Sequence, residues 1–114
     1  SRREEIRAER MPLAEWLGDF VTEFSTTHGL RPERVALRFA EPDLEVRIDP
    51  SHLHQILWNL CENALKYGLG AAETAFELNA GRAPATGRPF LEVADHGAGI
   101  ETAAAERIFE PFFT

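Results

Sequence analysis

Basic residues are scarce in this chain and never form a run. The 114 residues include 12 Lys and Arg against 19 Asp and Glu, which gives a formal net charge of -7 at pH 7. A protein that binds nucleic acid needs clustered positive charge along the phosphate backbone. We therefore expect no nucleic-acid partner, whereas a nucleotide held through a divalent cation remains compatible with the charge.

Cysteine and long apolar stretches are also scarce. Cys61 is the single cysteine, which excludes an internal disulfide and a cysteine-based metal cluster and suits a reducing compartment such as the cytoplasm. No stretch reaches the roughly 20 apolar residues of a membrane helix, and the charged start does not resemble a secretory signal. We expect no membrane contact from this part of the molecule, although a parent protein could carry membrane segments upstream.

Apolar side chains are plentiful, at 44% of the residues with eight Phe among them, and this is enough for one core. Residues 1–10 are rich in charge and are expected to be a solvated helix end or a linker. Residues 11–114 are then expected to form a single domain.

Apolar residues at helical spacing predict two helices. The first runs from Leu13 to about Gly29, where a glycine can close it. The second begins at Asp49-Pro50-Ser51, because Asp can cap the first amides and Pro fits the first turn, and it ends at Gly68. This second helix carries an unbroken apolar stripe.

Strands are predicted over 35–39, 44–48, 74–78 and 90–94. The first two are separated by a short turn and are expected to pair as a hairpin, and a Gly- and Pro-rich turn over 79–89 joins the others. A short helix is expected over 102–109, before Pro111. This order favours an α+β two-layer sandwich with helices on one face of a mixed sheet.

The second predicted helix has a polar face opposite its apolar stripe. Asn59 and Asn63 lie one turn apart, and Lys66 and Tyr67 follow in the next turn. Amide oxygens suit Mg²⁺, which takes most of its other ligands from water and phosphate, and Lys66 would meet phosphate charge. The alternative is an ordinary solvated surface on which Glu62 and Lys66 form an exposed ion pair.

A glycine turn follows the last predicted strand and contains Asp95, Gly97, Gly99 and Ile100. The glycines would let the backbone approach a flat ring closely, and the Asp95 carboxylate could accept the exocyclic amino group of adenine. Guanine presents a carbonyl oxygen there, so ATP would be preferred over GTP. The alternative is a simple turn, because this glycine pattern alone is a weak signal.

Three segments taken in order resemble the N box, G1 box and F box of bacterial two-component sensor histidine kinases, members of the gyrase-like ATPase group. These segments are 59–67, 95–100 and 108–113. The start of the chain resembles the end of a histidine-bearing helical hairpin in the nitrogen-regulator branch, and the pilus-gene regulators of that branch are the nearest resemblance. The resemblance implies the fold of a histidine kinase ATPase domain, truncated at its C-terminus.

The resemblance also implies roles for individual residues. Asn63 would supply an oxygen to Mg²⁺ and Asn59 would support the same region. Lys66 and Tyr67 would lie beside the phosphates of ATP. Asp95 would hold adenine, in a pocket lined by the residues Gly97, Gly99 and Ile100.

A parent protein of this kind would be a protein-histidine kinase. It would transfer the γ-phosphoryl group of ATP to a histidine of a separate dimerisation domain, for relay to a response-regulator receiver domain. The sequence stops at Thr114 without the second glycine box of the family and without an acceptor-like histidine, so we expect the isolated chain to bind ATP weakly and not to phosphorylate itself. The alternatives are an ATP-hydrolysing clamp of the gyrase or chaperone group and a non-catalytic interaction module of the same fold.

Overall fold

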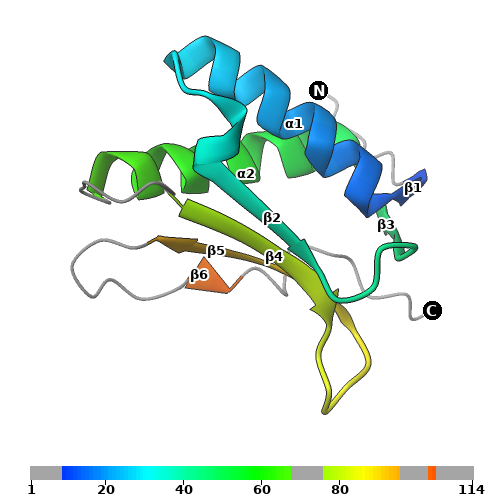
Figure 1. Cartoon of the computed structure of the whole chain (residues 1–114). Helices are drawn as coiled ribbons and strands as arrows, with labels where there is room; N and C mark the ends of the chain where they lie inside the picture. Colours follow the sequence, from blue (N-terminus) through cyan, green and yellow to red (C-terminus); the bar gives the residue numbers. More distant parts are fainter. Residues whose placement is uncertain (1–8, 68–75, 96–102, 105–114) are drawn as a thin grey trace, which may run out of the picture.

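A computed structural model describes residues 9–67, 76–95 and 103–104 (Figure 1). Two helices lie on one face of a sheet, so the expected α+β sandwich is confirmed (Figure 1). Neither helix of the described ranges is long and apolar enough to cross a membrane. In chain order the elements are β1 (Glu9–Pro12), α1 (Leu13–His28), a 3-10 turn η1 (Pro32–Arg34), β2 (Val35–Phe39), β3 (Glu45–Ile48), α2 (Pro50–Tyr67), β4 (Phe76–Arg82), β5 (Pro89–Asp95) and β6 (Ala103–Ala104).

The main sheet is mixed, as expected. Within the described residues it has four strands in the order β2-β4-β5-β6, in which β2 runs parallel to β4 and the other neighbours are antiparallel. In the β4–β5 pair, Phe76 lies opposite Asp95 at one end and Arg82 lies opposite Pro89 at the other. This register defines the two ends of the molecule that matter for the site.

The predicted hairpin of 35–39 with 44–48 is wrong. β2 pairs with β4, whereas β3 pairs antiparallel with β1 in a separate two-stranded sheet. The connection between β2 and β3 does not form a hairpin turn, because its two ends bond to different parts of the molecule. The Ala40 amide donates to the Ala80 carbonyl at 2.9 Å, and the Leu44 carbonyl accepts from the Leu13 amide at 3.1 Å. Alternation of apolar and polar residues predicts a strand but does not identify the strand with which it pairs. Glu9 and Arg10, expected in a linker, form half of β1.

Two further boundaries differ from the sequence prediction. β4 continues to Arg82 through residues assigned to a turn, and it is held there by Asn79, whose amide donates to the Glu92 carboxylate of β5 at 3.1 Å. Ala103 and Ala104 fall within the predicted helix 102–109 but pair as a strand with β5. Sheet pairing thus overrides local propensity. The rest of that predicted helix lies outside the described residues, as does the aromatic segment up to residue 114.

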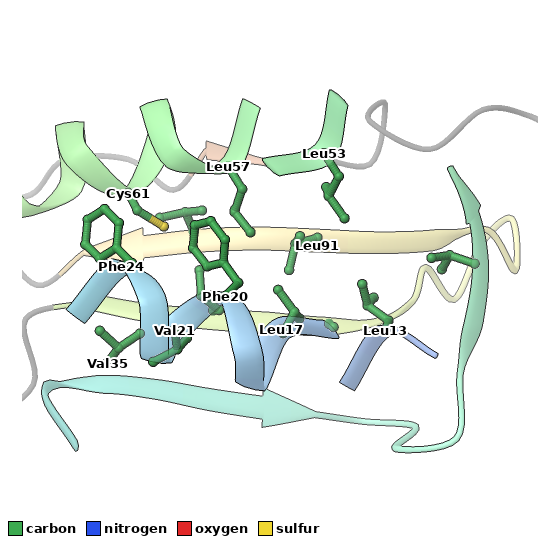
Figure 2. Close-up of a cluster of buried hydrophobic side chains, with 14 of the residues drawn as sticks. Leu13, Leu17, Phe20, Val21, Phe24, Val35, Leu53, Leu57, Cys61 and Leu91 are labelled. Atoms are coloured by element: carbon green, nitrogen blue, oxygen red, sulfur yellow. The ribbon is translucent and has the colours of Figure 1, made fainter. Parts of the chain in front are cut away.

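The core lies between the helices and the sheet (Figure 2). Apolar residues of α1 and α2 point into the same space toward Leu91 of β5 (Figure 2). Cys61 belongs to this core, and burial raises the pKa of its thiol. The helical residues buried here are Leu13, Leu17, Phe20, Val21 and Phe24 from α1 and Leu53, Leu57, Cys61 and Ala64 from α2.

Replacement of glycine by alanine should have opposite effects on the free energy of unfolding at Gly18 and at Gly29. Gly29 closes the helix with φ of 67°, in the left-handed region, so Gly29→Ala should lower the free energy of unfolding by about 1 kcal/mol. Gly18 lies inside the helix, with open space where the Cβ of an alanine would lie, so Gly18→Ala should raise it by about 0.5–1 kcal/mol. Urea unfolding of both variants checks the signs, and two shifts of the same sign would contradict this account.

Candidate functional site

The polar face of α2 is set by the buried face of the same helix. Asp49 starts the helix by accepting from the Ser51 amide at 2.9 Å, as the sequence predicts. Because Leu57 and Cys61 are fully buried toward the sheet, the opposite residues must face outward. Asn59, Asn63 and Lys66 are accordingly exposed, so the structure places these three predicted site residues together on one helix.

An open pocket of about 360 Å³ lies at the C-terminal ends of α1 and α2. Asn63 and Lys66 contribute to it, and Asn59 is not among its lining residues. The pocket joins an amide, a lysine ammonium and a carboxylate with an imidazole from α1. Its lining residues are His28, Glu62, Asn63, Leu65 and Lys66.

His28 brings α1 into this pocket. Its Nδ1 lies 3.1 Å from the Phe24 carbonyl oxygen and its Nε2 lies 3.1 Å from Oε2 of Glu62. Both ring nitrogens thus face oxygen atoms, one of the backbone of α1 and one of the Glu62 side chain. The ring also stacks on Phe24 with centroids 4.2 Å apart.

Sequence reasoning gave His28 no role and assigned Glu62 only to an ion pair with Lys66. The partner of Glu62 is 34 residues away along the chain, and helical spacing carries no information about such a contact. The one local signal was that His28 lies four residues after Phe24 on the aromatic side of α1.

The end of β5 lies at the same end of the sheet as this pocket. Asp95 ends β5 opposite Phe76, and Phe76 is buried with its ring 5.9 Å from that of Phe24, one turn before His28. α2 also packs against β5 and β4. The side chains of Tyr67 and Asp95, and the predicted residues Gly97, Gly99 and Ile100, lie outside the described part of the structure.

The side chains of the pocket fit a phosphate-bound Mg²⁺ in their chemistry. Asn63 offers an exposed amide oxygen, a ligand type that this hard cation accepts. Lys66, on the same side of α2, carries charge of the sign that phosphate requires. Mg²⁺ usually keeps several waters and takes few protein ligands when it arrives with phosphates, so one amide is a sufficient protein contribution.

A second hollow, of about 490 Å³, lies at the opposite end of the β4–β5 pair. It is larger, but its charges are mixed: Arg82 pairs with Glu41 at 3.0 Å and Arg10 with Glu45 at 3.8 Å. Among the predicted site residues whose side chains the structure describes, Asn59, Asn63 and Lys66 do not line it. It therefore provides an internal reference against which the location of the site can be tested.

Comparison with known proteins agrees with the expected family. A family model described as "Histidine kinase-, DNA gyrase B-, and HSP90-like ATPase" matches residues 48–114. The sensor protein kinase PilS of Pseudomonas aeruginosa is 36% identical over the whole chain, which spans 22% of that protein. The sensor histidine kinase component HK1 of Mycobacterium tuberculosis is 37% identical over 79% of this chain and 47% of its own length.

Two solved structures with a similar fold are histidine kinases. Acinetobacter baumannii histidine kinase AdeS matches with a TM-score of 0.60 and 17% identity, covering 86% of this chain and 46% of that one. The catalytic domain of histidine kinase ThkA matches with a TM-score of 0.57 and 23% identity, covering 95% and 71%. At these identities the likeness supports the fold, and the resemblance seen in the sequence is confirmed at the level of the family.

Proposed function

Since the chain belongs to the family of histidine kinase-, DNA gyrase B- and HSP90-like ATPases, we propose that it provides the ATP-binding site of a sensor histidine kinase. The protein containing it would transfer the γ-phosphoryl group of ATP to a histidine of a separate dimerisation domain. That histidine would then pass the group to the receiver domain of a response regulator. We propose that this domain works in the cytoplasm.

One observation carries the proposal. Asn63 and Lys66 line an open pocket at the end of α2, and α2 packs on β5, whose last residue is Asp95. The two motifs that sequence reasoning assigned to the phosphates and to adenine are thus attached to neighbouring elements. A kinase site needs mainly positioning and charge neutralisation, which an amide, a lysine and a cation supply.

Each residue has a proposed role. Asn63 holds Mg²⁺, which when bound neutralises charge on the phosphates, and Lys66 contacts a phosphate oxygen. Asn59 supports the same region, and Tyr67 lies beside the phosphates. Asp95 accepts the amino group of adenine, and the adenine pocket is completed by Gly97, Gly99 and Ile100.

An ATP-hydrolysing clamp is the second candidate for this family. In the related hydrolases a carboxylate one turn before the metal-binding Asn activates water, and here Asn59 occupies that position on the exposed face of α2. An amide cannot accept the proton of the attacking water. This favours transfer to histidine over hydrolysis, and a steady-state ATPase rate close to the autophosphorylation rate or above it would reverse the preference.

Asp95→Asn should reduce the selectivity for ATP over GTP by about tenfold or more, because the amide side chain no longer opposes the guanine carbonyl oxygen. Competition of ATP and GTP for a fluorescent nucleotide on the full-length protein measures this ratio. Glu92→Gln is the matched control, since Glu92 lies on the same strand and bonds Asn79. An unchanged ratio in Asp95→Asn would remove Asp95 from adenine recognition.

A further inference from the structure

We propose that His28 is a positioning residue of the nucleotide site, which holds the Glu62 carboxylate away from the phosphates. This inference rests on the proposed function, because a carboxylate is harmful in this pocket only if the ligand is anionic. His28 ends α1 and does not belong to any of the motif segments on α2 or β5. His28 itself lines the pocket, but its polar contact within that lining is with Glu62, through which its effect on the ligand would act.

Glu62 contributes the carboxylate of the pocket lining, and the position of this carboxylate would affect a bound phosphate. It directly precedes Asn63 and lies four residues before Lys66, so its carboxylate can reach the lysine that would bind phosphate. Its side chain is 48% exposed, so packing alone does not fix its rotamer. A carboxylate that swings toward the ligand would repel the phosphates and compete for Lys66.

His28 has the fixed geometry needed to hold that carboxylate. Its side chain is only 21% exposed, and Nε2 meets Oε2 of Glu62 at 3.1 Å. The orientation of the imidazole ring is fixed by the contact of its Nδ1 with the Phe24 carbonyl oxygen and by its stacking on the Phe24 ring. The last turn of α1 thus holds the Glu62 carboxylate at the His28 ring, within the wall of the pocket that α1 contributes.

The molecule contains a matched pair that lacks the contact with the pocket. His54 of α2 meets Glu23 of α1 at 3.2 Å and stacks on Trp58 with centroids 5.2 Å apart. This pair joins the same two helices with the same chemistry, but neither residue lines the pocket. His54 lies two turns before Glu62, about 12 Å along the helix. A general loosening of the α1–α2 contact should follow from loss of either histidine.

The test measures KM and kcat for ATP in autophosphorylation of the full-length protein. His28→Ala should raise KM about tenfold and change kcat by less than about twofold, because repulsion weakens binding without altering the transferred group. Adding Glu62→Gln to His28→Ala should return KM to that of Glu62→Gln alone. His54→Ala should leave KM as in the wild type.

Several results would overturn the inference. A KM that stays high in the double variant, or that rises equally in His54→Ala, would mean that His28 acts only through helix packing. If circular dichroism shows that His28→Ala does not fold, His28→Gln and His28→Asn take its place. His28→Gln keeps a donor toward Glu62 and should shift KM less than His28→Asn. Glu62→Gln should rescue KM in these variants as well, and absence of rescue would again reject the role. A wild-type protein without saturable ATP dependence would instead refute the proposed function itself.

Discussion

Asn63→Ala should lower the rate of phosphoryl transfer from ATP by about 100-fold or more. The substitution removes the amide oxygen that Asn63 contributes to the pocket lining, and a correctly placed cation contributes several kcal/mol of charge stabilisation in phosphoryl transfer. Autophosphorylation of the full-length protein with radiolabelled ATP, followed over a range of Mg²⁺ concentrations, measures the loss. We expect the Mg²⁺ dependence to weaken together with the rate.

Gln55→Ala is the matched control for this experiment. Gln55 is an exposed amide on the same helix, two turns before Asn63, and it does not line the pocket. Its loss should leave the rate within about twofold, since exposed substitutions away from a site have small effects. Equal losses in Gln55→Ala and Asn63→Ala would show that helix stability, and not metal binding, is being measured.

Phe24→Ala should have the largest effect on stability, lowering the free energy of unfolding by about 3–5 kcal/mol. The ring is 1% exposed and meets Trp58 of α2 at 4.9 Å and Phe76 of β4 at 5.9 Å, so it joins both helices to the sheet. A cavity at this junction cannot collapse without moving all three elements.

Urea unfolding followed by tryptophan fluorescence measures the Phe24→Ala effect. Thr27→Ala, at an exposed position one turn further along α1, should change stability by less than about 0.5 kcal/mol. The Phe24 substitution also removes the ring that supports His28. A Phe24→Ala protein with nearly unchanged stability would mean that the aromatic contacts between α1, α2 and β4 are not important for the fold.

The helices and the polar face of α2 could be predicted because their signals are local. Residues four apart on a helix lie on one side whatever the rest of the chain does, so Asn59 and Asn63 could be placed together from spacing alone. The capping oxygen of Asp49 and the left-handed closure at Gly29 follow from chemistry within three or four residues.

Strand partners and cross-helix contacts could not be predicted in the same way. β2 and β3 each read correctly as strands, but the choice of β4 and β1 as their partners depends on hydrogen bonds between distant segments. The same holds for His28, which reaches Glu62 only after α1 and α2 have packed. The sequence of α2 thus indicates which side chains could bind a ligand. Only the packing of α1 on α2 shows which neighbouring residue constrains them.

The most direct test of the central claim locates the nucleotide by paramagnetic NMR. ATP with Mn²⁺ in place of Mg²⁺ is titrated into the full-length protein, with nucleotide-free Mn²⁺ as the reference. We expect amide signals around Asn63 and the end of β5 near Asp95 to broaden first. Arg82, which lines the second hollow, lies six residues from Phe76 along β4, about 20 Å. The amide signals around that hollow should therefore persist. Nucleotide-dependent broadening that begins around Arg47 and Arg82 and spares Asn63 would contradict the account.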